Sequence, residues 1–151
     1  MSWATLTDQI TSLVSSNAST LGIQEVKGYP TLNFTGYPAI SLFPSDNEND
    51  YETTSENERI YAWKLMCVYE TKVTGLDSAF DALYDIVDGV MDLLDKENEL
   101  QSGKTIGVSM PARYTFINIF ATPNLFGNTE DENLIFGELT VRIRVSYDAY
   151  P

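Results

Sequence analysis

The segment LDSAFDALYDIVDGVMDLLD, residues 76–95, repeats its apolar and acidic residues with the period of an α-helix. With Asp77 at 0° and 100° per residue, six aspartates fall within an arc of about 80°. They are Asp77, Asp81, Asp85, Asp88, Asp92 and Asp95. The opposite side holds the apolar residues Leu76, Phe80, Leu83, Tyr84, Val87, Val90, Met91 and Leu94, with Ile86 and Leu93 at its edge. The pattern predicts a helix with a core face and an acidic face, and Gly89 is the one position that looks like a break.

The row of aspartates has four interpretations. A solvated face is the plainest, although exposed helix faces usually mix lysine with acids and the only lysine here is Lys96. Aspartates suit hard cations, but carboxylates in line along one helix do not converge on a point. A hydrolase with paired carboxylates needs acids that face each other across a cleft, and no second wall is identifiable. The fourth interpretation is a surface of one charge shown to a partner or to a channel.

The rest of the chain predicts a second helix and several strands. Residues 3–15 carry apolar side chains at helical spacing, and residues 138–147 alternate between apolar and polar side chains. Further strands are expected at residues 23–27, 39–43, 58–71 and 104–120, with a kink or bulge at Pro111, and loops at residues 45–58 and 121–133. This order predicts an α+β fold, in which a mostly antiparallel sheet packs with two main amphipathic helices.

Length and charge limit the class of protein. The chain of 151 residues has the size of one domain, so we expect a single domain over residues 1–151. Nine basic and 22 acidic residues give a net charge of −13. This charge argues against a nucleic-acid-binding protein, because such a protein needs cations to neutralise phosphates. Apolar runs are too short for a membrane-spanning helix, and the N-terminus lacks the features of a secretory signal.

The chain has no histidine and a single cysteine, Cys67. The lack of histidine removes the commonest general base, the commonest zinc ligand and every histidine-dependent triad. A cysteine in the middle of a strand, with no histidine available as a partner, is expected to be a buried structural thiol. We therefore expect no enzymatic activity, no cofactor and no metal.

Two short motifs match known sites only in part. Residues 46–50 resemble the start of a calcium-binding loop, but Tyr51 stands where glycine is required and Asn57 where the last ligand belongs. Residues 103–105, GKT, lack the upstream glycine of a phosphate-binding loop, because position 98 is Asn98. We interpret the first as a flexible acidic loop and the second as a chance match.

Three arginines are candidate partners for an acidic surface. Arg142 and Arg144 share the outward side of the last strand, where they could meet the aspartates of a neighbouring element or subunit. Arg59 shares one side of its strand with aromatic residues, namely Tyr61, Trp63 and Tyr69. That side is expected to pack in the core or in cross-strand pairs, and a subunit interface is the alternative.

The order of these features supports a family resemblance. A short amphipathic helix precedes the strand YPAISLFP, and a polar loop follows it. The next strand opens with an acid-arginine-x-aromatic pattern, Glu58-Arg59-Ile60-Tyr61-Ala62-Trp63. An amphipathic helix and two closing strands complete the chain. In length and layout, over nearly the whole chain, this resembles the tail terminator proteins of tailed bacteriophages and, more loosely, related neck and tail-completion proteins.

The resemblance implies a structural protein that assembles as a homo-hexameric ring. Such a ring caps the finished tail tube, stops its polymerisation and presents a surface to the head-side connector. Its partners are other copies of itself, the tail tube protein (with the sheath in a contractile tail) and the connector protein, and DNA passes an acidic lumen without specific binding. The implied location is the neck of the virion, after assembly in the host cytoplasm. We expect subunits to pair through strand edges and through residues 45–58 and 121–133.

Two other classes of function stay open. A small monomeric acidic binding module or inhibitor could use the aspartate row to mimic nucleic acid. A carboxylate-dependent or metal-dependent enzyme is the third class, and the missing histidine and the unconverged aspartates argue against it.

Overall fold

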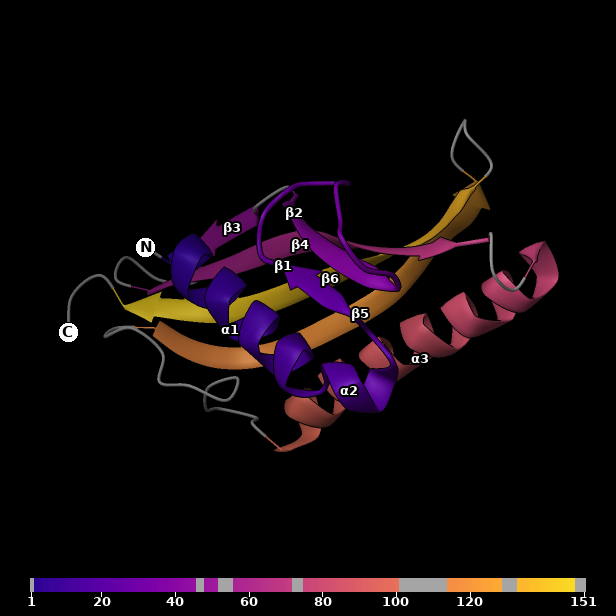
Figure 1. Ribbon diagram of the computed structural model, residues 1–151. Coiled ribbons are helices and arrows are strands. Elements are labelled where there is room, and N and C mark those ends of the chain that lie inside the picture. The colour runs from indigo at the N-terminus through magenta and orange to yellow at the C-terminus, as the bar shows by residue number, and fades with distance from the viewer. Residues whose placement is uncertain are drawn as a thin grey trace.

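The computed structural model describes residues 2–45, 48–51, 56–71, 75–100, 114–128 and 133–148. Three helices and six strands lie in these ranges (Figure 1). The helices are α1 (Ser2–Ser16), α2 (Ala18–Leu21) and α3 (Leu76–Leu100). The strands are β1 (Glu25–Lys27), β2 (Ala39–Pro44), β3 (Glu48–Tyr51), β4 (Glu56–Glu70), β5 (Tyr114–Asn128) and β6 (Leu134–Asp148). The fold is α+β, as predicted.

All six strands belong to one sheet with the order β1-β2-β4-β6-β5, and β3 pairs with the first part of β4. The pair β1 and β2 is parallel, and every other pair is antiparallel. At the centre, β4 pairs with β6 over 15 residues, from Glu56 opposite Asp148 to Glu70 opposite Leu134. The prediction of a mostly antiparallel sheet is confirmed.

The two faces of the sheet differ in what covers them. Odd-numbered residues of β4 and β6, such as Leu65 and Val141, belong to the same buried cluster as residues of α1 and α3. Both main helices therefore pack on this face (Figure 1). The other face consists of the even-numbered residues 60–70 of β4 and 134–146 of β6, and no helix of the described chain packs on it. We call it the open face.

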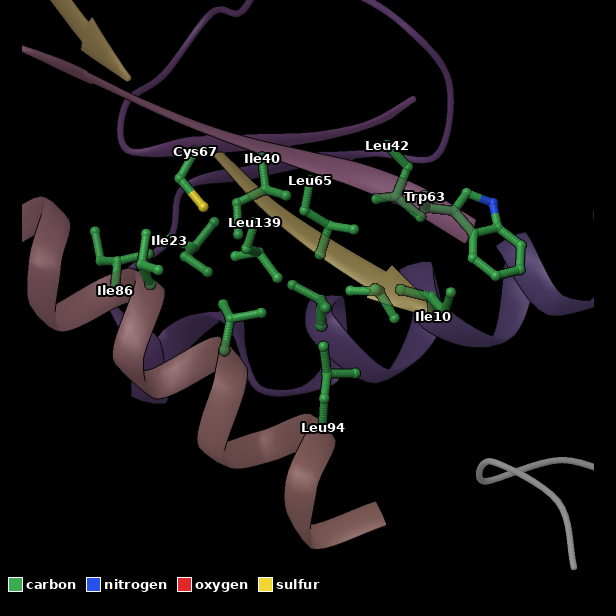
Figure 2. Packing of buried hydrophobic residues seen from close by; sticks show 14 of the residues in the cluster. Ile10, Ile23, Ile40, Leu42, Trp63, Leu65, Cys67, Ile86, Leu94 and Leu139 are labelled. Atoms are coloured by element: carbon green, nitrogen blue, oxygen red, sulfur yellow. The ribbon is translucent and has the colours of Figure 1, made fainter. Parts of the chain in front are cut away.

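The contact between α1 and the sheet centres on Trp63, the largest fully buried side chain. Its indole Nε1 donates a hydrogen bond of 2.9 Å to Oγ1 of Thr7. The ring of Trp3 packs against it edge-on, with 5.1 Å between the ring centroids. Ile10 of α1 lies in the same region of the core (Figure 2). The buried indole therefore has both an apolar environment and a polar partner.

The contact between α3 and the sheet consists of the apolar face predicted for this helix. Leu83, Val90 and Leu94 are completely buried. Figure 2 shows Leu94 pointing from α3 toward the sheet residues, among which Leu139 is labelled. A helix with this burial is held by its packing, whatever its other side carries.

Gly89 does not break α3, which continues through it. A Cβ atom at this position would lie only 2.7 Å from Cδ2 of Leu21 in α2. The missing side chain therefore lets α2 pack directly on α3, and the glycine is explained by this close approach.

Two segments that the sequence predicts as loops are partly strands. Residues 48–51 form β3, which pairs with residues 57–60 of β4. β5 continues to Asn128, with a register shift between Pro123 and Leu125. In both places backbone pairing to a long neighbouring strand outweighs a loop-like composition. The part of the predicted strand before residue 114, including the kink at Pro111, lies outside the described residues.

The segment between β1 and β2 is held by Glu25. Its Oε2 accepts hydrogen bonds from the backbone N–H of Thr35 at 2.7 Å, the backbone N–H of Gly36 at 3.2 Å and the hydroxyl of Thr35 at 3.2 Å. Its Oε1 pairs with Nζ of Lys27 at 3.1 Å. The Thr35 amide, followed by Lys27, favours the charged form and lowers the pKa of Glu25 to about 2.

Truncation of the α3 core face should destabilise the fold. We expect Leu83→Ala to lower the free energy of unfolding by about 2–5 kcal/mol, because it removes a fully buried side chain. The matched control is Leu76→Ala on the same helix, where the side chain is 46% exposed and the expected loss is below about 1 kcal/mol. Urea unfolding followed by circular dichroism measures both, and equal losses would contradict the assignment of the two faces.

Glu25 should stabilise the fold in a pH-dependent way. Its pKa falls from an ordinary value of 4.5 to about 2 on folding, so the stabilisation is complete above about pH 4.5 and is lost as the pH falls toward 2. We expect Glu25→Gln to lower Tm at pH 7 and to match the wild type near pH 2. Thermal unfolding between pH 2 and 7 measures the difference, with Asp8→Asn as a control for the loss of one charge. A difference that does not change with pH would contradict this role of the carboxylate.

Candidate functional site

All six aspartates of α3 are exposed. They follow one side of the helix over about 27 Å, given a rise of 1.5 Å per residue. We call residues Asp77, Asp81, Asp85, Asp88, Asp92 and Asp95 the aspartate stripe. Because the buried apolar face already holds the helix, the stripe is displayed without being needed for packing. Contact of the aspartate stripe with a partner or with passing DNA stays a prediction.

An exposed aromatic pair lies beside the stripe. The sequence assigns Tyr84 and Leu76 to the core face, and this is wrong, since they are 44% and 46% exposed. Tyr84 follows Asp77 by seven residues, which is a rotation of about 700° around the helix, so its side chain points within about 20° of that aspartate. Leu76 is the first residue of the helix. The Tyr84 ring packs edge-on against Phe126 of β5, with centroids 4.8 Å apart, and Phe126 is 36% exposed. The helical angle could have revealed Tyr84, whereas nothing in the sequence indicates its contact with Phe126.

Arg142 and Arg144 lie on the open face, on the side that the alternation of their strand predicts. Arg142 is exposed, and Arg144 is half-buried. Lys64 of β4 lies on the same face, where its Nζ is 3.5 Å from Oε1 of Glu138. The open face therefore carries three basic side chains on the side of the sheet opposite to α3. Within one chain, the structure does not bring the two arginines and the aspartate stripe together.

Arg59 lies on the opposite face of the sheet from Arg142 and Arg144. It is an odd-numbered residue of β4 and so points to the helix side, where its Nη1 donates a hydrogen bond of 3.3 Å to the hydroxyl of Tyr61. Tyr61 and Trp63 belong to the core, and Trp3 packs edge-on against Tyr61 at 5.0 Å. The aromatic side of β4 is thus a core surface, which is the plainer of the two interpretations.

Among the described residues, hollows border α3 on two sides, and each of the two includes one aspartate of the stripe. One of about 220 Å³ lies between α2 and α3 and includes Asp92 and Lys96. The other, of about 420 Å³, includes Asp85, Tyr37 and Tyr69. Their polar groups are few and do not converge as those of a catalytic site do.

In the ranges that the structure describes, no group of three or more His, Cys, Asp or Glu side chains could hold a metal ion. None of the described helices is long and apolar enough to cross a membrane. The partial calcium motif falls partly outside the described residues, and the GKT segment falls wholly outside them.

Cys67 is buried in β4 on the helix side, as expected of a structural thiol (Figure 2). Burial in an apolar environment disfavours the thiolate and raises the pKa of Cys67 to about 12. The thiol is therefore unreactive in the folded chain.

The sequence matches no model of a known protein family and no curated protein. The fold, in contrast, is similar to that of a chain from a virion of a native gene transfer agent (GTA) particle. The TM-score is 0.66 at 14% sequence identity, and the likeness covers 93% of this chain and 94% of that chain. At this identity the likeness concerns the fold, and it extends over nearly the full length of both chains.

The burial of Cys67 is directly measurable. We expect no reaction of the native protein with an aromatic disulfide reagent at about pH 7.5, because the thiol is inaccessible and its pKa is raised to about 12. Unfolding in urea should release one reactive thiol per chain. Rapid reaction without denaturant would contradict the packing of β4 against the helices.

Proposed function

We propose that this protein is a structural, non-enzymatic subunit of a phage-type virion, and that it acts in the neck as a tail terminator. The observation that carries the proposal is the likeness, over 93% of the chain, to the fold of a chain in a gene transfer agent virion. The order of helices and strands, which resembles that of tail terminators, supports the finer assignment.

In this proposal, copies of the chain form a homo-hexameric ring on the end of the tail tube. The ring stops tube polymerisation, and its other side meets the head-side connector. Assembly takes place in the host cytoplasm, and the protein remains in the virion. The net charge of −13 supports a role beside DNA that must pass without sticking, because acidic surfaces repel phosphates.

Enzymatic catalysis is a less well supported function for the aspartate stripe. The aspartates of α3 spread over about 27 Å of helix instead of converging, and the chain has no histidine. The single thiol is buried, with a raised pKa. These features support a binding or assembly role for the aspartate stripe.

The exposed stripe also supports a second candidate, an acidic module that mimics nucleic acid. Duplex DNA carries one charge per about 1.7 Å along its axis, whereas the stripe carries about one per 5 Å. The lower density makes the stripe a poor copy of a duplex. A pull-down that recovered a DNA-binding protein, and lost it when Asp81, Asp85 and Asp88 were changed to Asn, would favour this candidate.

Ring formation tests the main proposal. Native mass spectrometry at physiological salt should detect hexamers, either of the protein alone or after it is mixed with purified tail tubes. Tubes capped by the protein should stop growing when tube subunits are added. A chain that stays monomeric even with tail tubes would rule out the ring.

A further inference from the structure

The charged surfaces of this chain lie on opposite sides of the molecule. The aspartate stripe faces away from the sheet on α3, and Lys64, Arg142 and Arg144 lie on the open face. One chain cannot bring these two surfaces together, because its own sheet and core lie between them. Two copies of the chain can do so.

The spacing of the two sets of charges is compatible. Asp81 and Asp85 are one helical turn apart, which corresponds to a rise of about 6 Å. Arg142 and Arg144 are two residues apart on β6, which corresponds to about 7 Å. Both pairs project from regular elements, so a helix laid along the strand can place each carboxylate near one guanidinium, with a geometry that suits charge-assisted hydrogen bonds.

The α3 side also offers an aromatic contact. Tyr84 lies between Asp81 and Asp85 in the sequence, is 44% exposed and is supported by the ring of Phe126. Tyrosine and arginine are among the residues enriched where binding energy is concentrated at interfaces, and a guanidinium can stack on a phenol ring. The α3 surface therefore offers an aromatic contact residue, Tyr84, in addition to its charged residues.

We propose that the surface formed by Asp81, Tyr84 and Asp85 binds the open face of a second copy of this chain at Arg142 and Arg144. The two surfaces differ, so each copy can bind one neighbour through its α3 surface and another neighbour through its open face. Such head-to-tail contacts close into a ring or continue as a filament. The inference rests on the proposed ring function and names the surfaces that build the ring.

Charge reversal on each face tests the contact. The variant Asp81→Arg/Asp85→Arg changes the net charge from −13 to −9, which by itself favours association. We expect the opposite result, an association at least roughly tenfold weaker, because arginines then face arginines. The variant Arg142→Asp/Arg144→Asp should weaken association in the same way. The combination of all four changes keeps the net charge at −13 and should recover assembly.

The control is Asp8→Arg, a charge reversal on the exposed side of α1 that changes the net charge from −13 to −11 and should therefore not weaken association. Sedimentation velocity over a range of concentrations measures all variants, with tail tubes added if the wild type needs them. If the wild type forms rings and both face variants form them equally well, the interface is wrong while the ring function stands. If the wild type never forms rings, with or without tubes, the ring function itself fails.

Disulfide trapping tests the contact independently of ring closure. Cys67 is buried, so cysteines introduced at Asp85 and Arg142 are the reactive thiols of the variant Asp85→Cys/Arg142→Cys. Mild oxidation at high protein concentration should give a ladder of linked multimers, and Asp8→Cys/Arg142→Cys should not. A mixture of the two single variants should give linked mixed dimers. Linked dimers of Asp85→Cys alone, or no linkage in the double variant, would overturn the proposal.

Discussion

The pairing of β4 with β6 is the constraint on which the rest of the structure depends. The two strands stay in antiparallel register over 15 residues, so the alternation of their side chains is kept along the whole length. A slip of β6 by one residue along β4 would turn Val141 away from the helices and turn Arg142 into the core. The register therefore decides at once which side of the sheet accepts helices and which side carries Lys64, Arg142 and Arg144.

The helices on one side of the sheet hold the aspartate stripe away from the basic residues of the other side. The stripe lies on the outer side of the helix layer, while Arg142, Arg144 and Lys64 lie on the uncovered side together with Glu70 and Glu138. Copies of a chain with a net charge of −13 repel one another at long range. A stable contact between copies has to overcome this repulsion locally. The attraction between the aspartate stripe of one copy and the basic residues on the open face of another can do so.

The elements that were predictable from sequence are those that bury one side. α1, α3 and β6 repeat their apolar residues with the period of the element, and β4 is rich in aromatic and branched residues, so the sequence identifies all four. β3 has no such repeat, since ENDY is polar and is held by backbone bonds to β4. The later part of β5 contains Pro123, which an edge strand accommodates beside a register shift. Tyr84 is predicted to lie on the core face with the apolar residues of its helix, although tyrosine is suited to both core and surface.

The same distinction applies to the charged surfaces. The aspartate stripe is visible in the sequence because it depends on the helical period alone. Its position relative to Arg142 and Arg144 cannot be predicted from the sequence, because that position depends on which side of the sheet the helices cover. Which side they cover is a property of the whole fold. A fold held by apolar residues at fixed periods also tolerates extensive change elsewhere. This is consistent with a likeness at 14% identity over 93% of the chain. One backbone of this kind can therefore present different surface residues, and so different binding properties, without a change of fold.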